Sequence, residues 1–119
     1  MTRAELEKIC MSFPGTRQDV KWEQDLCYVV AEKMYCVTNM EGPLKLSLKV
    51  QAEEMQELLE REGIVPAPYL ARNNWVLVEK PNAFTAKEWQ HYLRQSYDLV
   101  VTKLPKKTQA KLIGKSSKK

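Results

Sequence analysis

The chain has 119 residues and a mass of 13.8 kDa, with 44% apolar residues, 29% charged residues and a formal net charge of +4 at pH 7. A chain of this length buries about two thirds of the surface that it exposes when unfolded, which is enough for one domain with a core that needs no metal or disulfide. This composition excludes collagen-like, wholly disordered and purely coiled-coil proteins.

The positive charge is concentrated at the C-terminal end. No acidic residue follows Asp98, whereas seven lysines do: Lys103, Lys106, Lys107, Lys111, Lys115, Lys118 and Lys119. The other 12 basic residues share residues 1–98 with all 15 acidic ones, so this part has a net charge of −3. We therefore divide the chain into a domain over residues 1–104 and a basic tail over residues 105–119, which we expect to be flexible or to rest against an acidic helix of the same chain.

The first half of the sequence predicts a helix followed by a β-meander. Thr2 and Glu5 have capping-box spacing, and Pro14-Gly15 follows the helix that they open. From residue 17 to residue 50 the hydrophobic period is two, and three turn-like breaks divide this stretch into four short antiparallel strands. In the last strand, apolar residues alternate with Lys45, Ser47 and Lys49. One face of the sheet should therefore pack on the core while the other stays open.

The second half adds two helices and one strand. Residues 52–62 predict a helix that Gly63 ends, and Pro66-Ala67-Pro68 argues against regular structure directly afterwards. Residues 75–78 predict a fifth strand, and a second capping box at Thr85 and Glu88 opens the longest helix. The predicted fold is α+β, a two-layer sandwich with an antiparallel sheet of about five strands and the element order α-β4-α-β-α.

The three cysteines, Cys10, Cys27 and Cys36, cannot all pair within one chain and form no Cys-x-x-Cys motif. We expect buried, reduced thiols, and the strand register decides whether Cys27 faces Cys36. The sequence shows neither a signal-peptide core nor an apolar run of membrane length, so we expect a cytoplasmic protein without a membrane partner.

Residues for catalysis are scarce. His91 is the only histidine and falls off the inner face of its helix, so we interpret it as a surface residue. The scattered cysteines lack the spacing of zinc ligands, and the glycines stand singly rather than in a phosphate-binding loop. The sequence therefore predicts no enzyme, no cofactor, no metal and no small-molecule substrate.

Two groups of residues are candidates for binding DNA. The first group lies on the open sheet face and at the ends of its hairpins, where an aromatic such as Trp22 could also wedge or stack: Lys21, Lys45, Lys49, Arg72 and Trp75. The second group lies in the tail and would bind any polyanion by counterion release: Lys106, Lys107 and Lys111. Lysines on a strand are also the ordinary way to keep an open sheet face hydrated, and this alternative stays open.

Five segments together resemble the MmcQ/YjbR family of small bacterial proteins over residues 1–104. They are Phe13-Pro14-Gly15-Thr16, Lys33-Met34-Tyr35, Leu48-Lys49, Pro68-Tyr69-Leu70 with Arg72 and Trp75-Val76, and Ser96-Tyr97-Asp98-Leu99-Val100. The resemblance implies a fold related to the CyaY-like and secretion-chaperone-like folds and a proposed double-wing mode of DNA binding, with no established activity or cofactor. Asn73 and Asn74 depart from the family, whose members often carry a basic residue or histidine here.

A protein-interaction adaptor is the alternative function. The resemblance to secretion-chaperone-like folds implies dimerisation or peptide capture through a sheet surface. Residues 75–78 are apolar on both strand faces, so another part of the chain, a second subunit or a client could cover part of the open face, unless the strand is simply buried at the sheet centre. We expect a binding protein with DNA as its leading ligand and a protein partner or a second copy as the alternative.

Overall fold

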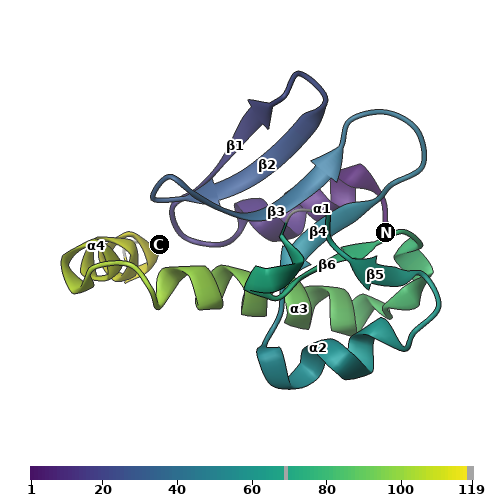
Figure 1. Cartoon of the computed structure of the whole chain (residues 1–119). Coiled ribbons are helices and arrows are strands. Elements are labelled where there is room, and N and C mark those ends of the chain that lie inside the picture. Colours follow the sequence, from purple (N-terminus) through teal and green to yellow (C-terminus); the bar gives the residue numbers. More distant parts are fainter. Residues whose placement is uncertain (69, 118–119) are drawn as a thin grey trace.

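The structure is a computed structural model that describes residues 1–68 and 70–117 (Figure 1). Its helices are α1 (Arg3–Met11), α2 (Ala52–Leu59), α3 (Ala86–Val101) and α4 (Lys106–Ser117), with two short 3-10 turns, η1 (Ala71–Asn73) and η2 (Pro81–Ala83). Its strands are β1 (Thr16–Lys21), β2 (Asp25–Val30), β3 (Lys33–Asn39), β4 (Leu46–Lys49), β5 (Ile64–Pro66) and β6 (Trp75–Val78). They form one antiparallel sheet in the order β1-β2-β3-β4-β6-β5, which confirms the predicted α+β class.

The sheet has one strand more than the sequence predicts. Residues 64–66 form β5, which pairs with β6 in the register Ile64 to Val78 and Pro66 to Val76. The prediction that Pro66 excludes regular structure was wrong because β5 is an edge strand. A proline at an edge can leave its missing N–H on the unpaired side.

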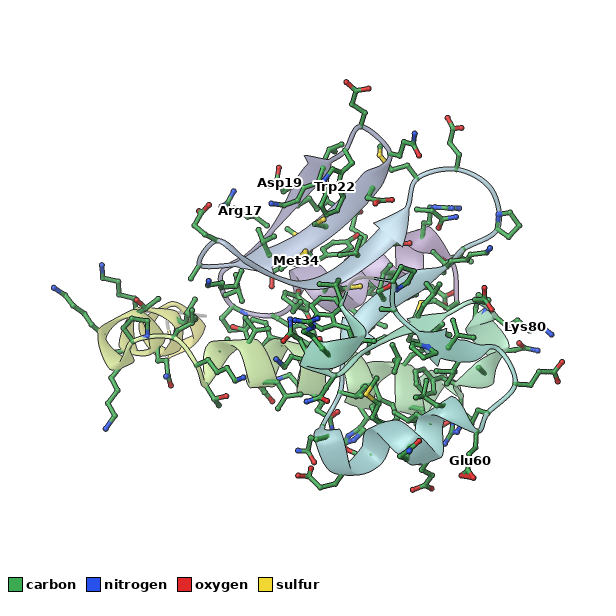
Figure 2. The ribbon with its side chains drawn as sticks, in the orientation of Figure 1. Arg17, Asp19, Trp22, Met34, Glu60 and Lys80 are labelled. Atoms are coloured by element: carbon green, nitrogen blue, oxygen red, sulfur yellow. The ribbon has the colours of Figure 1, made fainter. Side chains whose placement is uncertain are left out.

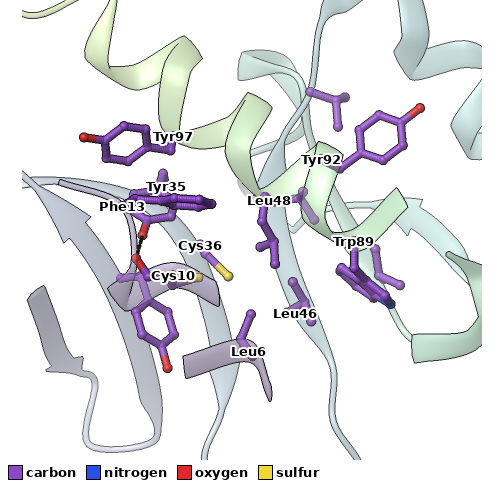
Figure 3. Close-up of a cluster of buried hydrophobic side chains, with 14 of the residues drawn as sticks. Leu6, Cys10, Phe13, Tyr35, Cys36, Leu46, Leu48, Trp89, Tyr92 and Tyr97 are labelled. Carbon is purple, nitrogen blue, oxygen red and sulfur yellow. Dashed lines mark hydrogen bonds between the residues drawn. The ribbon is translucent and has the colours of Figure 1, made fainter. Parts of the chain in front are cut away.

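The helices cover one face of the sheet. Helices α1 and α3 pack on it, with α3 against β3 and β4, and α2 lies beside β5 and α3 (Figure 1). The core between the layers holds Leu6 and Cys10 of α1, Cys36 of β3, and the aromatic side chains of α3 (Figure 3). Of the residues that the structure describes, the loop that contains η1 lies on the opposite face. Within the described residues, every helix is too short or too polar to span a membrane.

The cysteines are free and buried, as predicted. Cys36 is paired across the strands with Tyr28, whereas Cys27 is paired with Val37. Since neighbouring residues of a strand alternate between faces, Cys27 and Cys36 do not face each other. Cys36 instead lies in the core beside Cys10, and the hydrogen bond between the two thiols and their burial raise the pKa of Cys36 well above its usual value.

Both predicted capping boxes are present. The Thr2 hydroxyl accepts from the Glu5 amide at 3.1 Å, and the Glu5 carboxylate accepts from the Thr2 amide at 2.8 Å. Thr85 and Glu88 repeat this arrangement at the start of α3. Glu88 also forms an ion pair with Arg61, at 2.7 Å, which joins the end of α2 to the start of α3. Local sequence therefore determines where the two helices begin.

The segment predicted to be a flexible tail forms α4 between residues 106 and 117. Leu112 of this helix is buried and lies directly against Gly15. Gly15 has a φ of +77°, and a Cβ there would overlap the Leu112 side chain. The helix therefore docks on the loop between α1 and β1 rather than on the acidic α2, and glycine makes room for it.

A buried hydroxyl separates the ends of β3 and β4. The Asn39 amide donates to the Lys45 carbonyl and the ladder pairs Val37 with Ser47, so Tyr35 and Lys49 would be the next hydrogen-bonded pair. Instead, the Lys49 amide donates to the Ser96 hydroxyl of α3 at 2.9 Å, and this hydroxyl donates to the Tyr35 carbonyl at 2.6 Å. Ser96 thus takes the place of a ladder hydrogen bond and holds the two strands apart.

Replacing Ser96 with Ala should destabilise the fold. The change removes the one hydroxyl that serves both the Lys49 amide and the buried Tyr35 carbonyl, so we expect a loss of about 2–4 kcal/mol in the free energy of unfolding. Urea denaturation, monitored by circular dichroism, measures this loss of free energy. Ser12→Ala is the matched control, because the Ser12 hydroxyl is exposed and bonds only the Ile9 carbonyl at the end of α1. An equal effect of the two changes would contradict the bridge.

Replacing Gly15 with Ala should test the docking of α4. Gly15 and Gly42 have nearly the same φ, +77° and +79°, but nothing lies within 4 Å of a Cβ at Gly42. Both changes to Ala strain the backbone by about 1–2 kcal/mol, and Gly15→Ala should cost about 1–3 kcal/mol more through overpacking against Leu112. Thermal unfolding measures the difference in stability between the Gly15→Ala and Gly42→Ala variants. This difference should vanish when Leu112 is also replaced with Ala. If it persists there, Leu112 is not the cause of the extra destabilisation.

A candidate nucleic-acid interface

Four lysines from different parts of the chain line one groove at the edge of the open sheet face. The groove has a volume of about 570 Å³, and we call it the lysine groove. Its lysines are Lys21, Lys33, Lys49 and Lys103, and its other lining residues are Glu32, Met34, Leu70, Asn73, Trp75, Val100 and Leu104.

The fold explains why these lysines meet. Lys33 begins β3 and Lys49 ends β4, at the point where the Ser96 hydroxyl separates the two strands. Lys21 is the last residue of β1, and Lys103 follows the end of α3. Helix α3 therefore contributes the hydroxyl that separates the strands, and the turn that follows the helix contributes the cation Lys103 beside the gap.

The electrostatics of the lysine groove favour an anion. Burial lowers the pKa of Lys49, and the neighbouring Lys103 lowers it further. Glu32 is the only carboxylate that lines the groove, and it is ion-paired with Arg17. Among the described residues, Lys33, Lys49 and Lys103 form no ion pair with a carboxylate. A phosphate or another oxyanion would relieve the repulsion between these lysines.

A second groove on the same face is mainly apolar. It has a volume of about 730 Å³, and we call it the apolar groove. Its apolar lining residues are Trp22, Met34, Val37, Pro68, Leu70 and Leu77, and its polar ones are Asp25, Thr38, Asn39, Lys45 and Ser47. Met34 and Leu70 line both grooves, so the two form one continuous surface.

Trp22 stands at the turn between β1 and β2, and 67% of its surface is exposed (Figure 2). The figure also shows Met34, which the two grooves share, on the neighbouring β3. An indole with this exposure beside an apolar hollow offers a planar face to a ligand.

The residues that the sequence singles out are only partly brought together. Lys21, Lys49 and Trp75 line the lysine groove, and Lys45 lines the apolar groove. Trp75 is only 5% exposed, so its ring has no free face on which a base could stack. Arg72 is exposed in η1 and lines neither groove. The exposed Lys106, Lys107 and Lys111 lie on α4, which follows the groove-lining residue Leu104 by one residue.

Sequence reasoning missed Lys33 and Lys103 as parts of the site. In the sequence Lys33 falls at a turn-like break and Lys103 among the C-terminal lysines, so neither carries a local signal of its own. It also missed the apolar lining that Met34 and Val37 contribute from β3 and Leu77 from β6. These residues meet only through strand pairing.

The histidine, cysteine and carboxylate side chains of the described residues are dispersed. His91 is exposed on α3, as predicted. Nowhere in residues 1–68 and 70–117 do three histidine, cysteine or carboxylate side chains gather as ligands would. The surface offers a group of lysines, three of them without an ion-pair partner among the described residues, next to an apolar groove.

Comparisons with known proteins agree with this fold. A crystal structure of a Deinococcus radiodurans protein with a DUF419 domain has a TM-score of 0.85 and 29% sequence identity, and the match covers 93% of this chain and 87% of that one. A Pseudomonas syringae protein has a TM-score of 0.68 and 23% identity over 83% of this chain and 98% of that one, which shows a shared fold. The search of curated proteins found no match. The model of the YjbR family matches residues 11–99, most of the sequence, and the chain therefore belongs to the YjbR family.

Proposed function

We propose that this chain is a non-catalytic protein that binds DNA through its open sheet face. The lysine groove is the observation that carries the proposal. Four lysines converge there, of which Lys21 alone is ion-paired among the described residues, with Asp19, and the one carboxylate in the lining is already paired with Arg17. Such a surface gains affinity for a phosphate backbone by releasing the counterions of the nucleic acid. DNA is also the ligand that the resemblance to the MmcQ/YjbR family implies.

Helix α4 extends this basic surface. It begins at Lys106, three residues after Lys103, and Leu112 anchors it to the body of the domain. Its exposed lysines are therefore presented on an ordered helix next to the groove. They would strengthen attachment to phosphates without reading a sequence, because phosphate contacts position a protein and base contacts give specificity.

A cytoplasmic location of the protein would fit this function. The three cysteines are free and fully buried, and a chain with thiols and no disulfide is typical of reducing compartments. DNA is accessible there in bacterial cells.

The competing function is that of a protein-interaction adaptor, and the apolar groove is the feature that favours it. The two functions differ in what they require of the lysines. DNA binding needs Lys49 and Lys103 as cations, whereas an apolar peptide or a second copy would use Met34, Val37 and Leu77 and tolerate neutral side chains at the rim.

Neutralising the lysine groove should weaken DNA binding. Each lysine that contacts a phosphate contributes about 0.9 to the slope of log affinity against log salt, so Lys49→Gln/Lys103→Gln should make this slope shallower by about 2. Fluorescence anisotropy of a labelled duplex at several salt concentrations measures the slope. The matched control is Lys80→Gln/Lys87→Gln, which removes the same charge at a distance, since Lys80 pairs with Glu62 at the far end of the molecule (Figure 2).

A third variant separates the groove from α4. Lys106→Gln/Lys107→Gln/Lys111→Gln removes the charges of the helix but keeps Leu112 and the docking of α4. We expect this variant to retain the part of the binding that depends on Lys49 and Lys103. Loss of all binding in this variant, or equal slopes for the groove and control variants, would refute binding through the sheet face.

A further inference from the structure

The conformation of Trp22 is costly for folding. Trp22 has a φ of +54° and the following Glu23 a φ of +61°, although glycine and asparagine are the residues that suit the left-handed region. A bulky residue there is a genuine outlier. Its ring is 67% exposed, so burial does not repay the strain. Ala31 and Glu32 in the turn between β2 and β3 have the same backbone conformation, so the tight hairpin accounts for the positive φ. The exposure of the Trp22 ring is the feature that points to a role in binding.

The surroundings of Trp22 define what could bind. The indole lines the apolar groove together with Met34, Leu70 and Leu77, and the groove is continuous with the lysine groove through Met34 and Leu70. A ligand that uses both grooves must carry anionic groups along one side and flat, apolar faces along the other. The volume of about 730 Å³ lies in the range of pockets that hold compact organic groups.

We propose that the open sheet face binds single-stranded nucleic acid, with the phosphates in the lysine groove and at least one base stacked on Trp22 over the apolar groove. This inference rests on the proposed function and narrows its ligand. Proteins that bind single strands combine a cationic path for the backbone with aromatic side chains for the bases, and both features are present on this face.

A duplex fits the two grooves less well. Its bases are stacked on one another, so their flat faces are closed to an indole unless a base is flipped out at a cost. In a single strand the bases are free to splay away from the backbone and enter the hollow. The Ser47 hydroxyl lies in the lining of the apolar groove and can meet the edge of a base there, whereas the Thr38 hydroxyl already donates to the Lys45 carbonyl.

Tryptophan fluorescence tests the proposal directly. The chain has three tryptophans, and Trp75 and Trp89 are only 5% and 2% exposed, so quenching by a stacked base would report on Trp22. The probes are a 12-nucleotide oligo-dT, an oligo-U RNA of the same length, a 12-base-pair duplex and an inorganic polyphosphate. We expect the single strands to bind at least fivefold more tightly than the duplex and to quench the emission, while polyphosphate binds without comparable quenching.

Variants of Trp22 identify the stacking residue. Trp22→Ala should weaken oligo-dT binding by about 5- to 150-fold, the range expected for one stacked base, and should change duplex and polyphosphate binding less than twofold. Trp22→Phe should keep most of the affinity. Thermal unfolding serves as the check on folding, and Trp22→Gly, which suits a positive φ, provides a variant that lacks the ring but relieves the strain.

The outcomes separate this inference from the proposed function. If oligo-dT binds no more tightly than the duplex, or if Trp22→Ala and Trp22→Gly leave its affinity unchanged, the inference is wrong. The DNA-binding proposal would then survive as long as Lys49→Gln/Lys103→Gln still weakens duplex binding. If that variant changes the binding of none of the probes, the proposed function fails as well. Equal binding of the DNA and RNA single strands supports the inference and shows that the 2′-hydroxyl is not read.

Discussion

The Ser96 hydroxyl is the contact on which the architecture of the open face depends. It lies between an amide of β4 and a carbonyl of β3 that would otherwise bond to each other. Because both groups are buried and satisfied, the strands remain apart without the penalty of a broken ladder. Lys33 and Lys49 then lie on either side of the gap, and Trp75 lies buried beside it. A single side chain of α3 on one face of the sheet thus shapes a groove on the other.

The same face carries features that stability alone does not favour. Lysines stand close enough for Lys103 to lower the pKa of Lys49, and Trp22 occupies a backbone region that suits glycine. Most of the chain follows ordinary folding rules, with capping boxes and an apolar core, although Ala31, Glu32 and Asn74 also have a positive φ. Natural proteins tend to violate these rules at functional sites, and here the violations cluster around two connected grooves.

Much of the fold could be predicted from the sequence because its signals are local. Two capping boxes mark the starts of α1 and α3, and alternation in residues 44–50 defines the buried face of β4. The strand β5 escaped prediction because Pro66 is tolerated only at an edge, and edge position depends on topology. The flexible tail was expected from composition, whereas the contact between Leu112 and Gly15 joins residues that lie far apart in the sequence.

The candidate site was less predictable than the fold. The lysines of β1 and β4 could be placed on the open face from alternation, but Lys33 and Lys103 join them only through the divergence of two strands and the length of α3. Trp75 shows the opposite error, since its residue type suggested stacking and the packing of the sheet buries it. Sites that are assembled from side chains of several elements require the register, which the sequence does not display.

Hydrogen exchange of the Lys49 backbone amide, monitored by NMR, tests the role of Ser96 most directly. If the hydroxyl replaces the ladder bond, the Lys49 amide should be as strongly protected as the ladder amides of β4 in the native protein. In the Ser96→Ala variant, measured where the protein remains folded, this amide should lose protection selectively while the ladder amides keep theirs. Unchanged protection of the Lys49 amide in the variant would contradict the account, because it would show that β3 and β4 do not need the hydroxyl between them.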